Sequence, residues 1–153
     1  MEITCLDDQD THPVDTDALA RLARHVLEAE GVGGDVELAL SFVSEDAIAA
    51  LNEAHLGHAG PTDVLSFAIE DDLAAALAGL AGPGTVLLGD VVICPAVAFA
   101  NAPAHAGTYE DELELLVVHG ILHLLGRDHE ADEEAEEMEA REQAILAAFR
   151  AER

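Results

Sequence analysis

Apolar residues recur along this chain at two different spacings, which predict helices and strands in turn. Spacings of three and four positions predict helices over residues 19–27 and 47–51, with Thr16 and Ser44 as their N-caps. Over residues 36–42, Val, Leu, Leu and Phe alternate with Glu37, Ala39 and Ser41, which predicts a half-buried strand. The first third of the chain therefore carries both kinds of element.

The rest of the chain continues this mixture. The further predicted elements are a short edge strand over residues 2–6, a loop leading into a strand over 61–67, an apolar strand over 85–93, and helices over 95–106 and 130–150. Residues 71–84, rich in alanine and glycine, are expected to form a flexible excursion, and the acidic residues of the last helix a solvated face. These elements indicate the α+β class: a single domain over residues 1–153, in which one face of a small mixed β-sheet packs against helices.

The sequence around residue 119 is almost wholly apolar, which predicts a buried helix at the centre of the domain, with Thr108 as its N-cap. His119 and His123 stand four positions apart, so on a helix both imidazoles leave the same face. Gly126 is expected to end this helix, because glycine adopts the left-handed conformation of a helix C-terminus. The resulting turn can bring His129 round to face the other two imidazoles.

These three histidines predict a metal site. A single histidine on an apolar helix is usually a hydrogen-bonded core residue, but two in one apolar run are costly to bury, at roughly 2 kcal/mol each if unsatisfied. Three neutral imidazoles suit Zn²⁺ and leave a fourth position open for water or substrate. Cys5 and Cys94 lie far from the motif, which favours an open, catalytic type of site with one zinc ion per chain over a closed structural site.

The same histidine spacing occurs in the long motif of zinc proteases, with one difference. In those enzymes the residue after the first histidine is a glutamate that acts as the general base. That position is Gly120 in this chain, and glycine cannot move a proton. Peptide hydrolysis on that plan is therefore disfavoured.

The charge of the chain works against binding to nucleic acids. The 153 residues carry a formal net charge of −26, and the 6 basic residues are all arginines. Such a surface repels polyanions, whereas proteins that bind nucleic acids gain much of their affinity from lysine and arginine on phosphates.

The sequence predicts a soluble cytoplasmic protein with no membrane partner. It has two distant cysteines, an N-terminal stretch without the features of a secretory signal, and no apolar run long enough to cross a bilayer.

Three stretches nonetheless resemble, in their order and spacing, the YbeY family of bacterial endoribonucleases. They are Pro-Thr-Asp-Val-Leu-Ser-Phe at 61–67, Leu-Gly-Asp-Val-Val-Ile-Cys at 88–94, and the histidine motif at 119–129. The resemblance implies a zinc-dependent hydrolase of single-stranded RNA, active in late quality control of the small ribosomal subunit and in maturation of the 3′ end of its ribosomal RNA. The implied partners are ribosomal RNA and the small subunit or its assembly proteins.

The resemblance also implies roles for individual residues. His119, His123 and His129 match the metal ligands of the family, and Asp90 matches a carboxylate that lies near the site. Asp90 and Asp128 are the candidates for a catalytic base. Asp128 stands beside His129 in the sequence and equally suits a role in orienting a ligand imidazole.

Two departures from the family pattern remove positive charge. Leu56 stands where many relatives carry an arginine implicated in activity, and Gly60 stands where a lysine is common. His58, which is partly protonated near neutral pH, is a candidate to replace some of this charge on the substrate side. Because those cations are missing, a second function stays open: a zinc-stabilised ribosome assembly factor with little nuclease activity of its own.

Overall fold

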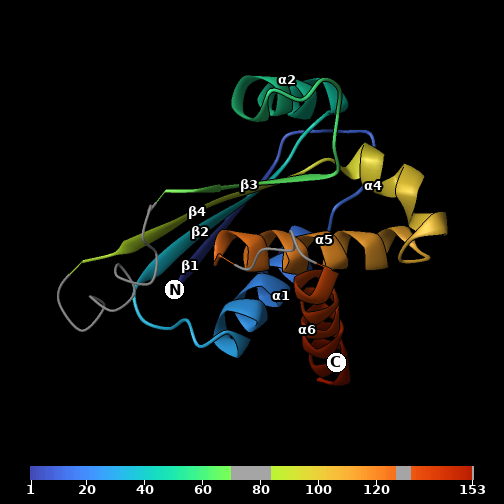
Figure 1. The fold of residues 1–153 in the computed structure, drawn as a ribbon. Helices are drawn as coiled ribbons and strands as arrows, with labels where there is room; N and C mark the ends of the chain where they lie inside the picture. The colour runs from blue at the N-terminus through green and yellow to red at the C-terminus, as the bar shows by residue number, and fades with distance from the viewer. Residues whose placement is uncertain (70–83, 127–131, 153) are drawn as a thin grey trace.

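A four-stranded mixed β-sheet forms the middle of the structure, with the strand order β1-β2-β4-β3 (Figure 1). The strands are β1 (Glu2–Asp7), β2 (Val36–Phe42), β3 (Val64–Ala68) and β4 (Val86–Ile93). β1, β2 and β4 run parallel to one another, and β3 is antiparallel to β4. The predicted α+β fold with a small mixed sheet is confirmed.

The computed structural model of this protein describes residues 1–69, 84–126 and 132–152. The predicted excursion over residues 71–84 lies almost wholly outside these ranges, so that prediction is not tested. Within these ranges, no helix is both long enough and apolar enough to cross a membrane.

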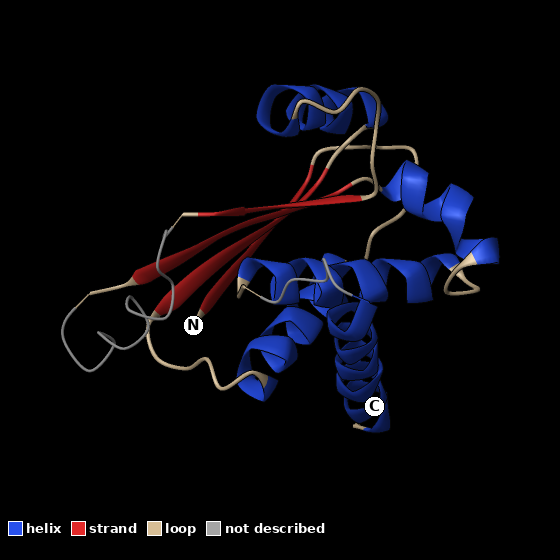
Figure 2. Cartoon of the chain, in the orientation of Figure 1, coloured by secondary structure: helices blue, strands red, loops and turns tan. Residues whose placement is uncertain are grey.

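Helices cover both faces of the sheet, and not the one face that was expected. The described helices are α1 (Thr16–Ala29), α2 (Glu45–Leu56), α4 (Pro95–Asn101), α5 (Tyr109–Leu124) and α6 (Asp132–Ala151), with a 3₁₀ turn (Ala102–Ala104) after α4. Figures 1 and 2 show α1, α5 and α6 on one side of the sheet and α2 on the other. Ile48 of α2 is buried together with Leu65 of β3 and Val92 of β4, which closes a second, smaller core under α2.

The ends of the helices follow local hydrogen bonding. The hydroxyl groups of Ser44 and Thr108 cap α2 and α5 as predicted, because each accepts a hydrogen bond from a backbone N–H three residues further on. α1 is capped by Asp15 and not by Thr16, since the carboxylate of Asp15 accepts the corresponding bond. α4 ends at Asn101, before the predicted residue 106. The chain continues as the 3₁₀ turn because Pro103 has no N–H to extend the α-helix.

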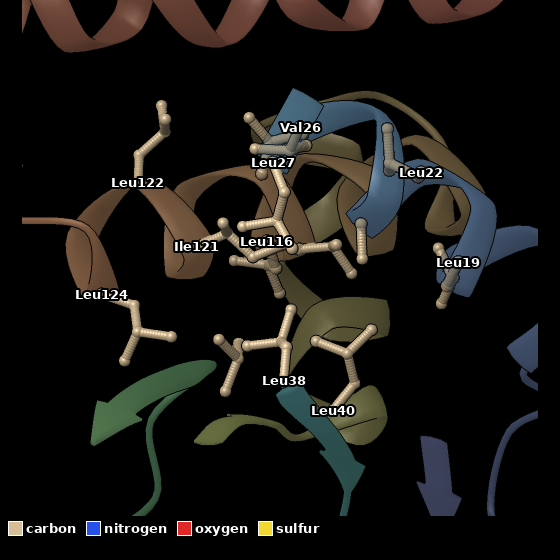
Figure 3. Packing of buried hydrophobic residues seen from close by; sticks show 14 of the residues in the cluster. Leu19, Leu22, Val26, Leu27, Leu38, Leu40, Leu116, Ile121, Leu122 and Leu124 are labelled. Atoms are coloured by element: carbon tan, nitrogen blue, oxygen red, sulfur yellow. The ribbon is translucent and has the colours of Figure 1, made fainter. Parts of the chain in front are cut away.

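The main hydrophobic core lies between the sheet and the pair α1 and α5. Figure 3 shows the side chains that meet there: Leu19, Leu22, Val26 and Leu27 of α1, Leu116, Ile121, Leu122 and Leu124 of α5, and Leu38 and Leu40 of β2. Each buried side chain of this size stabilises the fold by about 1.5–3 kcal/mol relative to its exposed state. α5 also contacts α4, α6, β3 and β4, so the prediction that the histidine-bearing helix is buried at the centre is confirmed.

Gly120 lets α5 approach the sheet closely. A Cβ atom at this position would lie 2.5 Å from Cγ1 of Val91 and 3.2 Å from Cγ2 of Val64. The hydroxyl of Ser66 on β3 donates a hydrogen bond of 2.8 Å to the carbonyl oxygen of Gly120. A glutamate at this position, as in the zinc proteases, could not fit against the sheet. The packing therefore also disfavours peptide hydrolysis by the mechanism of those enzymes.

Gly89 marks a bulge in β4, where the strand has one extra residue relative to β2. Its φ of +136° lies in a region that side-chain-bearing residues rarely adopt, and a Cβ atom would collide with the carbonyl oxygen of Phe67. Beyond this bulge the regular alternation of β4 resumes, with Val91 directed at α5.

We expect Gly120→Ala to destabilise the protein by about 1–3 kcal/mol through overpacking against Val91, although alanine is the better helix former. Gly33→Ala is the control, because its Cβ atom would meet no atom within 4 Å. Gly33→Ala should leave stability within about 0.5 kcal/mol of the wild type. Urea denaturation measures both variants, and equal midpoints for the two would show that α5 has room to move away from the sheet.

Candidate functional site

His119 and His123 lie side by side on α5. Their ring centroids are 5.3 Å apart and their planes are tilted by 50°. His119 is half-buried, with 29% of its side chain exposed, and His123 is exposed. The spacing of four positions on one helix produces this pair, as the sequence predicts.

Gly126 follows α5 with a φ of +95°, so the left-handed glycine predicted at the end of this helix is present. The next residues, 127–131, lie outside the described part of the chain, and with them His129 and Asp128. Among the residues that the structure does describe, no three histidine, cysteine, aspartate or glutamate side chains are grouped so that they could hold a metal ion. The structure therefore places only the first two of these histidines, and the predicted metal site is not tested.

Glu142 on α6 orients His119. Its carboxylate accepts a hydrogen bond of 2.9 Å from Nδ1 of His119, and only 5% of Glu142 is exposed. An ionised carboxylate only accepts, so this bond places the proton on Nδ1 and directs Nε2 away from α6. The prediction that the acidic residues of this helix are solvated is wrong for Glu142. The sequence does carry a signal: Glu142 stands four positions after Met138 and four before Leu146, on the buried stripe of α6.

A cavity of about 630 Å³ opens beside His119. Its walls come from the end of the loop before β3, from the loop before α5, and from α5 and α6. The polar residues that line it include Asp63, His105, His119, Glu139, Glu142 and Arg150. A concave site with a few convergent polar groups is the usual form of a binding site for a small ligand or for part of a larger one.

A second pair of histidine and glutamate lies at the same cavity. Glu112 of α5 is fully buried, and its two carboxylate oxygens lie 2.9 and 2.8 Å from Nδ1 of His105. One of these oxygens also accepts a hydrogen bond of 3.1 Å from the backbone N–H of Ala106. Sequence analysis did not single out this pair, although a glutamate four positions before Leu116 on an apolar helix is a detectable signal.

The pKa of His105 is raised above its ordinary value of 6.5, first by the hydrogen bond that the ring donates to Glu112. The negative charges of Glu112, Asp63 and Glu142 raise it further, and burial of the ring opposes them. His105 therefore keeps its proton at a higher pH than a free imidazole does.

Arg150 of α6 also lines the cavity. Its Nη2 lies 2.9 Å from Oε1 of Glu114 and 3.2 Å from Oδ1 of Asp111, and both acids are on α5. These ion pairs join the end of α6 to the beginning of α5. Two carboxylates thus neutralise the arginine of this cavity.

Asp90 and His58 do not join this group. Val91 is directed at α5, and successive side chains of a strand point to opposite faces, so Asp90 points to the face away from His119. His58 is exposed in the loop after α2. Neither residue lines the cavity.

The pair of His105 and Glu112 should make stability depend on pH. Because the folded-state pKa of His105 is raised, the pair stabilises the fold fully below about pH 6.5, and this contribution is lost as the pH rises through the raised value. His105→Gln should thus cost more stability at pH 6 than at pH 9 in urea denaturation. In a Glu112→Gln background the difference between the two pH values should become smaller, because the hydrogen bond to Glu112 is the largest cause of the raised pKa; an undiminished difference would assign the effect to another group.

The chain is similar by sequence to proteins of one family, and by structure to a solved protein. The family model described as Endoribonuclease YbeY matches residues 4–150. A protein named Endoribonuclease YbeY from Salinispora tropica is 44% identical over 143 residues, which cover 92% of this chain and 91% of that protein. A protein of the same name from Moorella thermoacetica is 42% identical over 151 residues, covering 96% of both. The solution structure of TM1509 from Thermotoga maritima has a TM-score of 0.59 and 29% identity, and the match covers 98% of this chain and 93% of that one.

Proposed function

This chain belongs to the Endoribonuclease YbeY family, and from that premise we propose that it is a zinc-dependent endoribonuclease that hydrolyses phosphodiester bonds in single-stranded RNA. The observation that carries the proposal is the position of His119, which stands on the wall of an open cavity, beside His123 and in a hydrogen bond to a buried carboxylate.

The donor chemistry of the described residues fits a zinc ion. Imidazoles that bind metals commonly donate their other ring N–H to a carboxylate, which fixes the tautomer and makes the free nitrogen more basic. Glu142 meets this requirement for His119, and His123 follows one helical turn later. His129 is proposed as the third ligand on the sequence motif alone. Zinc bound there would polarise a phosphate oxygen and make a water molecule a better nucleophile.

The protein itself contributes orientation and shape. Glu142 holds the His119 ring against α6, and the contact of α5 with the sheet fixes the backbone between the two histidines. Of the two candidate bases, Asp90 is separated from His119 by the sheet, and Asp128 remains a candidate on its sequence position.

The proposed setting follows from the family resemblance. The substrate would be ribosomal RNA in the cytoplasm, with action on the small subunit during late quality control and maturation of the 3′ end. The net charge of −26 favours the second candidate, a zinc-stabilised assembly factor that meets the subunit or its assembly proteins and turns over little RNA.

The purified protein should contain about one equivalent of zinc and should cleave an unstructured RNA, and a chelator should abolish the cleavage. The double variant with His119→Ala and His123→Ala should lose both zinc and activity. His55→Ala is the control, since His55 is an exposed histidine of α2 outside the cavity. Metal analysis and a gel-based cleavage assay measure the two properties.

Full zinc retention by the double variant would contradict the metal site. Zinc-loaded protein that cleaves no RNA under any condition would instead favour the assembly factor.

Glu142→Ala should weaken zinc binding by about 10–100-fold, because His119 loses the partner that fixes its tautomer and ring orientation. Glu139→Ala is the matched control: it removes a carboxylate of the same helix and the same cavity, but an exposed one. Competition with a chromophoric chelator measures both affinities. Equal losses in the two variants would mean that only the charge of the cavity matters, and not the hydrogen bond.

A further inference from the structure

The lining of the cavity beside α5 is acidic, which disfavours binding of a polyanion such as RNA. The carboxylates that line it are Asp63, Asp111, Glu139 and Glu142. RNA bound there needs hydrogen-bond donors for its phosphates, because an unpaired phosphate beside these acids would be repelled. One of the basic lining residues must supply such a donor.

Three basic side chains line the described part of the cavity, and two of them are committed elsewhere. Arg150 is paired with two carboxylates of α5. His119 donates Nδ1–H to Glu142 and is the proposed metal ligand. His105 remains: 59% of its side chain is exposed, and within the described part of the chain its Nε2 makes no hydrogen bond.

We propose that His105 is a substrate-binding residue of this site, whose imidazolium is oriented by Glu112 and donates its Nε2–H to a backbone phosphate of bound RNA. This inference rests on the proposed function, because it takes RNA as the ligand of the cavity. It assigns to His105 the binding of a phosphate and no part in moving a proton.

The surroundings of His105 suit this role. Glu112 is buried at the beginning of α5, and it holds both the imidazole and the backbone of the next residue, Ala106. The ring is therefore held in one orientation before RNA arrives, which lowers the entropy cost of binding. The raised pKa of His105 keeps the ring charged to a higher pH than that of a free imidazole, and a charged donor makes the stronger bond to a phosphate.

Binding of a fluorescent, nuclease-resistant 2′-O-methyl RNA, followed by anisotropy, tests the proposal directly. At pH 6.5, His105→Gln should weaken binding about tenfold, the value of one charge-assisted hydrogen bond. His105→Arg keeps a cation and should bind within a few-fold of the wild type. His12→Gln is the control, because His12 stacks on Phe99 outside the cavity. Circular dichroism melts confirm that each variant is folded.

The pH dependence separates binding from a purely structural role. Wild-type affinity should fall between pH 6.5 and pH 9, as His105 loses its proton, and affinity of the His105→Arg variant should fall less. The negatively charged groups that act on His105 are Glu112, Asp63 and Glu142, and Asp111, Glu139 and Arg150 also line the cavity. These groups and His119 are present in the wild type and in both His105 variants, so the comparison isolates His105.

Equal affinities of the wild type and His105→Gln at pH 6.5 would overturn the inference, and so would a wild type that does not bind the oligonucleotide at all. A loss in His105→Gln that is the same at pH 6.5 and pH 9 would also overturn it, since it would show that the ring acts by its shape. The cleavage assay distinguishes this inference from the proposed function. If the wild type and His105→Gln bind and cleave RNA equally well, this inference is refuted and the proposed function is left intact. Binding that depends on His105 without any cleavage would refute the nuclease and leave this inference intact.

Discussion

Helix α5 lies against β3 and β4 at a distance that only glycine permits, and the two histidines of the site stand before and after that contact. Gly120 is held by the hydroxyl of Ser66 and by close packing on Val91. Because a helix is stiff over a single turn, a backbone pinned at this residue also sets the positions of His119 and His123. The precision of the site therefore comes from the packing of a glycine, which has no chemistry of its own.

Two buried glutamates give the imidazoles their orientation. Glu112 and Glu142 are among the few charged side chains buried in the described structure, and a buried carboxylate without a partner would cost several kcal/mol. Each accepts a hydrogen bond from one histidine, and Glu112 also accepts one from the backbone of Ala106, so these contacts offset the cost of burial. Glu142 also bridges α6 to α5, and Arg150 joins the same two helices through Asp111 and Glu114. The same hydrogen bonds and ion pairs therefore stabilise the fold and position the side chains of the cavity.

The acidity of the chain has two opposite effects on a polyanionic substrate. The net charge of −26 repels RNA at a distance, and salt at physiological strength limits that repulsion to about 8 Å. Close to the cavity, the same kind of charge raises the pKa of His105 and so favours the cationic form of its ring. Glu112 thereby favours a protonated His105, which can donate a hydrogen bond to a phosphate on an otherwise acidic surface.

The sequence by itself determined the elements that depend on neighbouring residues. The alternation over 36–42, the caps at Ser44 and Thr108, and the apolar helix with His119 and His123 on one face all follow from local spacing. Only the tertiary structure decided which distant side chains meet. The contact of Glu142 with His119 spans two helices, the burial of Glu112 depends on the loop folded over it, and a bulge with the pleat of β4 turns Asp90 away from the site. These contacts arise from the packing of whole elements, and local periodicity shows which face of an element is buried but not what lies opposite that face.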